Sequence, residues 1–309
     1  MSEPALMSAR KDSSDGFIIV AVLWILGALA ALATVYSVYV INTATALAIN
    51  NDRVKAQALV SAGVELTAYQ LTAAPELPPR GRFSFRLGDA NVGVEFSSES
   101  ARIDLNTAPK ELLAGLFASL GVRREIADEL GERIVAWRTA PAEGQDTEAS
   151  NYRTAGRKYV PRGGLFPHVD ELSLVLGMSP ELVEQVSPFL TVYSGQSTIN
   201  IMAAPSQVLA ALPGMTPDRL YAILAQRQAP RPDLPALTAL LGPAQSLAAT
   251  ESSKSIRVNV RIQFDNGTQM SSEVVILLVD NDAEPYRTLF WRDDVEGTSP
   301  EPRRSAGTR

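Results

Sequence analysis

Apolar residues fill the chain from Phe17 to Ile41, and no charged side chain interrupts them. About 25 residues at about 1.5 Å per residue are long enough to cross the ~30 Å hydrocarbon core of a bilayer. A helix buried in a soluble protein rarely stays apolar on every face over such a length. The pattern therefore predicts one transmembrane helix over residues 17–41, preceded by a short polar leader over residues 1–16.

A cleavable secretory signal is the alternative to a membrane anchor. Such a signal has an apolar core of about 7–15 residues that ends at a small-residue cleavage site. The run here is longer, so cleavage after Ala44 or Ala46 is the minor alternative. Residues 42–71 continue in a helix-compatible pattern, and Pro75 stops it. We expect one long helix, with its first half in lipid and its second half on a soluble domain.

Alternation with a period of two marks strands near both ends of the soluble part. It covers residues 82–86 and 91–97, and it resumes at residues 254–264, 269–279 and 286–291. Between these segments, from Arg102 to about Gln228, the period is helical. The fold class predicted is α+β, in which an antiparallel sheet is interrupted by an inserted all-α domain.

The expected domain boundaries lie where the pattern changes. They are a first sheet part over 42–100, an inserted helical domain over 101–230, a second sheet part over 231–296 and a disordered polar tail over 297–309.

The helical block contains an internal repeat. Ile103-Asp104-Leu105-Asn106-Thr107-Ala108-Pro109 and Ile199-Asn200-Ile201-Met202-Ala203-Ala204-Pro205 each lead into a helix that opens at the proline. Gly121 and Gly214 then join each first helix to a second one, as in helix-hairpin-helix units. A third copy is expected over Phe166–Phe189.

Composition restricts the chemistry. The formal net charge is -6, which argues against broad nucleic-acid binding, and the chain has no cysteine for disulfides, thiol catalysis or Cys-ligated zinc. The only histidine, His168, follows a proline at a helix start, where we expect a capping or surface role. The motifs of serine hydrolases, zinc proteases, nucleotide-binding loops and dinucleotide-binding folds are absent from the sequence.

The polar leader ending in Gly16, followed by Phe17 and the apolar run, resembles the signal of type IV prepilins and pseudopilins. The resemblance implies cleavage after Gly16 by a membrane peptidase and methylation of Phe17. Most such subunits carry Glu at the fifth mature position, whereas this chain has Ala21 there. Loss of that Glu is typical of the K-type minor pseudopilin of type II secretion, although Ala21 taken alone is an ordinary apolar membrane residue.

Three further segments, residues 103–109, 167–178 and 286–292, also resemble the K-type minor pseudopilin. The resemblance implies a helical domain inserted into a pilin-type fold and a place at the pseudopilus tip. It further implies, as partners, the I-type and J-type minor pseudopilins, the major pseudopilin, the inner-membrane secretion platform, the prepilin peptidase and membrane lipid. Because of the acidic net charge, no nucleic acid is expected as a partner. The protein is expected to span the bacterial inner membrane once, with a cytoplasmic N-terminus and a periplasmic C-terminal domain.

A calcium site is the only cofactor that the resemblance suggests. Glu143, Asp146 and Glu148 cluster in a Gly-containing loop, and K-type relatives bind calcium near such a loop. The acidic run that comes after the tryptophan in those relatives is absent here, since Trp137 leads into Arg138-Thr139-Ala140-Pro141. We therefore expect a solvated acidic loop rather than a metal site.

Two other functional classes remain as alternatives. The helix-hairpin-helix units offer a membrane-anchored, exported DNA-binding protein, because such hairpins bind phosphate with backbone N–H groups and nearby cations. Arg123 and Arg124 suit that role, but Glu125, Asp128 and Glu129 come directly after them. A membrane-tethered enzyme ranks last, because no nucleophile, base and metal set converges in the sequence.

Overall fold

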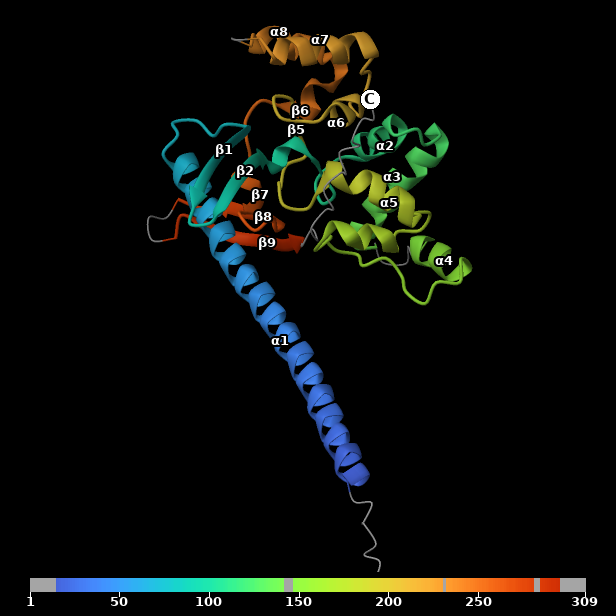
Figure 1. Cartoon of the computed structure of the whole chain (residues 1–309). Coiled ribbons are helices and arrows are strands. Elements are labelled where there is room, and N and C mark those ends of the chain that lie inside the picture. The colour runs from blue at the N-terminus through green and yellow to red at the C-terminus, as the bar shows by residue number, and fades with distance from the viewer. Residues whose placement is uncertain (1–14, 142–146, 230–231, 281–283, 295–309) are drawn as a thin grey trace, which may run out of the picture. The chain divides into compact units, whose positions relative to one another are not determined.

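The computed structural model describes residues 15–141, 147–229, 232–280 and 284–294 (Figure 1). The chain divides into two compact units, Met1–Ala58 and Leu59–Arg309. The long helix α1, Asp15–Thr72, begins in the first unit and ends in the second. It carries no proline, and Pro75, Pro78 and Pro79 come after its last turn, where a helix could not continue. The long helix predicted from the sequence is confirmed.

The second unit contains a five-stranded antiparallel sheet in the order β1-β2-β7-β8-β9. Its strands are β1 (Arg80–Leu87), β2 (Ala90–Ser98), β7 (Ser255–Phe264), β8 (Gln269–Leu278) and β9 (Tyr286–Asp294). The tight turns β1–β2 and β7–β8 contain Gly88 at φ 60° and Gly267 at φ 86°, a region that glycine enters without strain. Strands β2 and β7 are adjacent although a long stretch of sequence separates them, since Ala90 pairs with Phe264 and Ser98 with Ile256.

One face of this sheet packs on the last turns of α1. Alternate residues of β2 and β7, such as Val94 and Val260, are buried at 1% and 0% exposure. Gly63 of α1 lies against both valines, and a Cβ there would stand 3.2 Å from Val94. The helix therefore approaches the sheet closely at Gly63, because no side chain separates the two backbones.

A helical block separates β2 from β7, so the predicted α+β fold with an inserted helical domain is confirmed. Its helices are α2 (Lys110–Ser119), α3 (Arg124–Arg138), α4 (Thr147–Thr154), α5 (Pro180–Val186), α6 (Ser206–Ala210), α7 (Pro217–Arg227) and α8 (Leu234–Leu240). Four 3₁₀ segments lie among the described residues, namely η1 (Glu99–Ala101), η2 (Val169–Leu174), η3 (Ser187–Phe189) and η4 (Gly242–Leu247). The short strands β3 (Ile103–Asp104), β4 (Leu190–Thr191), β5 (Ile199–Asn200) and β6 (Ala248–Ala249) complete it.

The internal repeat is confirmed in three dimensions. Strand β3 pairs in parallel with β4, and β5 pairs in parallel with β6. Each half therefore runs from a two-residue strand through a helical hairpin and further helices to a second two-residue strand. The segment expected as a third copy forms η2 and α5, which close the first half as α8 and η4 close the second.

The helical block also extends further than the pattern suggested. The sequence pattern places the boundary of the second sheet part at residue 231, whereas α8, η4 and β6 occupy Leu234–Ala249. The strands themselves resume with β7 at Ser255, in agreement with the alternation over residues 254–264. Leu237, Leu241 and Ala244 are buried in the core of the helical block. The reason is that β5 needs a parallel partner, and β6 supplies it. The polar tail predicted over residues 297–309 lies outside the described residues.

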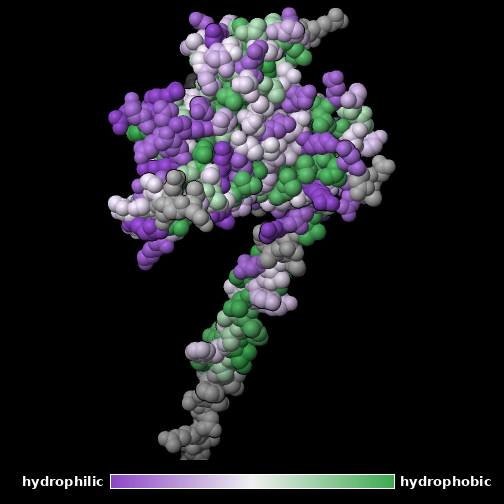
Figure 2. Space-filling model, turned by 180° about the vertical axis from the view of Figure 1, so that it is seen from behind, coloured by the Kyte–Doolittle hydropathy of each residue, from purple (hydrophilic) through white to green (hydrophobic). Residues whose placement is uncertain are grey.

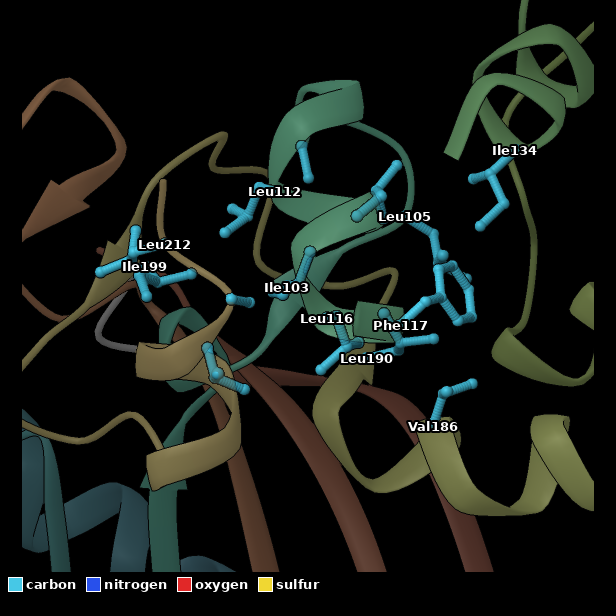
Figure 3. Close-up of a cluster of buried hydrophobic side chains, with 14 of the residues drawn as sticks. Ile103, Leu105, Leu112, Leu116, Phe117, Ile134, Val186, Leu190, Ile199 and Leu212 are labelled. Carbon is cyan, nitrogen blue, oxygen red and sulfur yellow. The ribbon is translucent and has the colours of Figure 1, made fainter. Parts of the chain in front are cut away.

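Both halves share one apolar core. Leu112, Leu116 and Phe117 of α2 meet Leu190 of the first half and Ile199 and Leu212 of the second (Figure 3). These six side chains are at most 2% exposed. The two repeats are therefore parts of a single folding unit rather than independent modules.

Candidate functional site

The membrane-compatible segment of α1 is Ile19–Thr43, 25 residues long and unburied in the structure. Apolar side chains gather along this part of the helix (Figure 2). It is the one helix among the described residues with the length and composition to cross a bilayer. Leu23 and Trp24 are 62% and 77% exposed, which a soluble protein would avoid over such a run. The segment is a membrane anchor.

The predicted processing residues lie at the start of this helix. Gly16 and Phe17 fall within α1, but the Phe17 side chain lies outside the described part of the structure, and residues 1–14 of the leader lie outside it entirely. Ala21 lies in the membrane-compatible segment, four residues after Phe17. Cleavage and methylation therefore stay predictions.

The inserted domain leaves and rejoins the sheet at one point. Ser98, the last residue of β2, accepts a hydrogen bond from the backbone N–H of Ser253 at 2.9 Å, and their hydroxyls are 3.1 Å apart. Ser98 and Ser100 hydroxyls are 2.8 Å apart. Because the two chain connections lie side by side, an insertion of this size leaves the sheet continuous.

A buried ion network lies beside that point. The Glu99 carboxylate is fully buried, and Arg257 of β7 donates to it from Nε at 2.7 Å and from a terminal nitrogen at 3.0 Å. Arg102 contacts the same carboxylate at 3.2 Å, and the Thr191 hydroxyl donates to it. Arg257 also pairs with Glu273 of β8, which pairs with Arg292 of β9 at 2.7 Å.

The electrostatic balance favours charge in this network. Burial alone would raise the pKa of Glu99, but the hydrogen bonds and charges of Arg257 and Arg102 outweigh it and hold the pKa below its ordinary value. Burial opposes the charge of Arg257 as well, but Glu99 and Glu273 raise its pKa above the ordinary value. No local sequence signal marks these residues, because Glu99 and Arg257 lie 158 positions apart.

An aromatic contact adds to this junction. Phe290 of β9 lies 5.1 Å from the His168 ring and 6.2 Å from the Tyr193 ring, between ring centroids. His168 Nδ1 accepts a hydrogen bond from the Asp170 N–H at 3.2 Å and so caps η2. The capping role expected for the single histidine is confirmed.

The acidic loop is only partly within the described residues. Glu143 and Asp146 lie outside them, whereas Glu148 lies in the first turn of α4. One Glu148 oxygen accepts from Asn151 at 3.0 Å, and the other is buried without a hydrogen-bond partner. Within the described residues no cluster of three or more His, Asp or Glu side chains could hold a metal ion. A single orphaned oxygen does not make a calcium site, so this site stays a prediction.

The first helical hairpin is poorly suited to nucleic acid. Arg124 pairs with Asp128 at 3.4 Å, and Lys110 pairs with Glu132 at 2.8 Å. Cations that are paired with acids on their own hairpin offer little net charge to a phosphate backbone. The hairpin geometry alone therefore does not favour the DNA-binding alternative.

The comparisons with known proteins agree with these observations. Residues 94–195 match the family described as type II secretion system protein K. In solved structures the fold is similar to a chain of the GspK–GspI–GspJ complex of the type 2 secretion system from enterotoxigenic Escherichia coli, with a TM-score of 0.54 and 15% sequence identity over 78% of this chain and 95% of that chain. The search of curated proteins found no match.

The region that matches the family contains part of these features. It begins in β2 and includes the buried Glu99, the first helical hairpin and β4. The structural similarity covers most of the chain and shows the same fold. The match to the family of type II secretion system protein K thus covers residues 94–195, and the structural similarity extends the likeness in fold to the sheet and the rest of the inserted helical domain.

Proposed function

We propose that this protein is a minor pseudopilin of the type II secretion apparatus, which caps the pseudopilus tip and supports its assembly and the export of folded proteins across the outer membrane. The observation that carries the proposal is an inserted domain, joined through Ser98 and Ser253 to a sheet that packs on α1. A pilin-type subunit needs its helix for lateral packing in a fibre. The insertion adds bulk that a subunit stacked above it would meet, whereas a tip position leaves that space free.

The partners come from the same proposal. The complex that contains the similar chain joins GspK to GspI and GspJ. We infer that this chain assembles with I-type and J-type minor pseudopilins, on a fibre of the major pseudopilin above the inner-membrane secretion platform. In this assembly the anchor spans the bacterial inner membrane, with the N-terminus in the cytoplasm and the soluble unit in the periplasm.

The membrane helix supports the tip position. A Glu in the apolar helix is tolerated when it pairs with the N-terminal amine of a neighbouring subunit, because an unpaired carboxylate in lipid is costly. A first subunit has no neighbour ahead of it, and Ala21 avoids that cost. Cleavage between Gly16 and Phe17 would produce the mature N-terminus, with methylated Phe17 as its first residue.

Two experiments test the proposal. The full-length protein in detergent should co-purify with the I-type and J-type partners, and labelling should find it at one end of the pseudopilus. Distribution along the whole fibre would contradict the tip position. N-terminal sequencing should begin at Phe17, and Gly16→Val should block processing because a branched Cβ crowds the cleavage site. A mature N-terminus near Ala46 would contradict cleavage at Gly16.

The role proposed is structural rather than enzymatic. His168, the single imidazole of the chain, caps a helix and contacts Phe290. The DNA-binding alternative predicts tight, salt-sensitive binding to duplex DNA, which an electrophoretic mobility assay would detect. Such binding without any partner complex would reverse the ranking of the two functions.

A further inference from the structure

We propose that the Glu99 network is a polar clamp that holds the inserted domain in one orientation on the sheet. The clamp consists of Glu99, Arg102 and Thr191 on the insert side and Arg257, Glu273 and Arg292 on the sheet side. This inference does not depend on the secretion function, because it concerns how two parts of one chain are fixed to each other.

The apolar core of the insert does not extend into the sheet. The buried cluster of the inserted domain runs from Ile103 to Ala244, and no residue of β1, β2, β7, β8 or β9 belongs to it among the described residues. The sheet buries its own apolar face on α1 through residues such as Val94 and Val260. A continuous apolar core, which would fix two parts by close packing, therefore does not join the sheet to the insert.

The covalent attachment of the insert does not fix its orientation by itself. The insert is attached by two chain connections that lie side by side at Ser98 and Ser253. Two adjacent connections restrict separation but permit the insert to swing about that point. Some contact other than the peptide links has to restrict this motion for a single orientation to persist.

The clamp supplies that contact with directional bonds. Arg257 holds both oxygens of Glu99 in a two-point pair, a geometry that fixes direction as well as distance. Thr191 donates to the same carboxylate from β4, and Arg102 reaches the Pro188 carbonyl at 3.1 Å. The bonds thus connect three strands of the sheet to the end of the first helical half.

Burial prevents water from replacing the partners in the clamp. The Glu99 side chain is 0% exposed and that of Arg257 is 12% exposed, so neither can exchange its partner for bulk water while the clamp is closed. Removing the Glu99 charge leaves Arg257 and Arg102 as close, half-compensated cations. Breaking a buried pair by neutralising one partner is far more disruptive than losing a surface pair, so the clamp should open rather than rearrange.

The Phe290 contact would add a second restriction on the motion of the insert. Phe290 touches His168 and Tyr193 of the insert, but these rings are partly exposed and the contact is not directional. Phe290 and Arg292 are two positions apart on β9, and their partners on β8, Val275 and Glu273, are also two positions apart. Because alternate residues of a strand share a face, the clamp and the aromatic contact lie on the same side of the sheet. Opening of the clamp would therefore loosen both.

The test uses the full-length chain in detergent, which has no native cysteine to interfere with spin labelling. Gln263→Cys on an exposed position of β7 and Glu184→Cys on α5 supply one label on each part. Pulsed electron spin distance measurements should give a narrow distribution for the parent. Glu99→Gln should at least double its width, whereas Glu95→Gln, an exposed carboxylate 3.8 Å from Arg261, should leave it unchanged.

A folded Glu99→Gln protein with an unchanged distance distribution would overturn the proposal. If circular dichroism shows that Glu99→Gln does not fold, the same measurement is made on Arg102→Gln and Thr191→Val, which keep the Glu99–Arg257 pair. Each of these should broaden the distribution by a smaller amount. An unchanged width in both would equally overturn the clamp.

Discussion

The two halves of the inserted domain share the same backbone pairing and an equivalent arginine. In the first half, the Leu105 N–H donates to the Thr191 carbonyl of β4 at 2.8 Å, and in the second the Ile201 N–H donates to the Ala249 carbonyl of β6 at 2.9 Å. Each half also ends its second helix with an arginine that returns to the start of the hairpin. Arg138 donates to the carbonyls of Leu105 and Ala108, and Arg227 donates to those of Ile201 and Ala204.

The halves differ at the polar residue of the first strand. Asp104 accepts from the N–H of Asn106, from the Ser194 hydroxyl and from the Gly195 N–H, at 2.8 to 2.9 Å. Asn200 also accepts from the N–H two residues on, at 2.8 Å, but its amide nitrogen donates to the carbonyls of Thr250 and Glu251. The carboxylate of Asp104 is surrounded by hydrogen-bond donors, whereas the amide of Asn200 faces two carbonyl acceptors. The difference therefore reflects the loops that leave β4 and β6.

The halves differ again after the shared arginine. The first half continues through α4 and returns at Phe166. The Trp137 ring contacts those of Tyr152, Tyr159 and Phe166, and the two tyrosine rings contact each other. The second half goes almost directly into α8. The hairpin, its parallel strands and its arginine are thus the constant unit, whereas the excursion is an addition with its own aromatic core.

A substitution at the contact between the two halves should cause the largest loss of stability. Gly115 of α2 lies against Ala211, just after α6, and a Cβ on Gly115 would stand 1.9 Å from the Ala211 carbonyl oxygen. Gly115→Ala forces α2 and α6 apart, which should cost about 5 kcal/mol, a large part of the stability of a domain. Urea unfolding followed by circular dichroism measures it.

Gly93 provides the matched control, because its nearest neighbour to an added Cβ is a carbonyl at 3.9 Å. Gly93→Ala should change stability by less than about 1 kcal/mol. Equal losses in the two variants would mean that the close approach of α2 and α6 does not hold the halves together.

A substitution in the aromatic cluster around Trp137 should cause the next largest loss of stability. Trp137 is 2% exposed and donates from Nε1 to Glu171 at 2.9 Å, whereas Gln226 takes the matching position before the second arginine and is partly exposed. Trp137→Ala should cost about 4 kcal/mol by cavity formation. Gln226→Ala should stay within about 0.5 kcal/mol. Thermal unfolding of both variants tests this difference between the halves, and similar losses would contradict it.

Substitution of Arg138 and of Arg227 should cause similar losses of stability, since both belong to the unit that the two halves share. Arg138→Met and Arg227→Met each leave two carbonyls without their charged donor, which should cost about 3 kcal/mol in either half. Chemical denaturation gives the two values. A loss confined to one half would show that the shared geometry does not mean a shared energetic role.

The acid and the amide should not be interchangeable. Asn200→Asp faces a carboxylate toward two carbonyls and should cost about 2 kcal/mol at pH 7, whereas Asp104→Asn loses one acceptor and should cost about 1 kcal/mol. In Asn200→Asp the burial and the carbonyls raise the pKa of the introduced acid in the folded state. The folded state then binds more protons than the unfolded state, so stability lost at pH 7 should return as the pH falls toward 4.

Denaturation of Asn200→Asp at pH 7 and pH 4.5, each compared with the parent, measures this recovery. A deficit that grows on acidification would mean that the introduced carboxylate is not held against the carbonyls.

Several features were predictable from local sequence. The apolar run from Phe17 to Ile41 determines a lipid-compatible helix, because hydropathy depends on composition alone. The turn Asp265-Asn266-Gly267 and the alternation on either side of it determine the β7–β8 hairpin. The repeated segments ending in Pro109 and Pro205 predicted the duplication. Each of these signals lies within a short stretch of chain.

Other features had no such local signal. Assignment of residues 234–249 to the helical block depends on β5, which comes much earlier in the chain, finding its partner in β6. The choice between Asp104 and Asn200 depends on loops attached to another strand. The processing and acidic-loop predictions at Gly16, Phe17, Glu143, Asp146 and Glu148 remain predictions.

By itself the sequence determined the anchor, the element types and the repeat, because periodicity and turn chemistry act between near neighbours. Only the tertiary structure decided that Glu99 and Arg257 meet in a buried pair and that Gly115 must lack a side chain. Both are consequences of contacts between distant segments. Their energies arise from desolvation and close packing, which have no local signature.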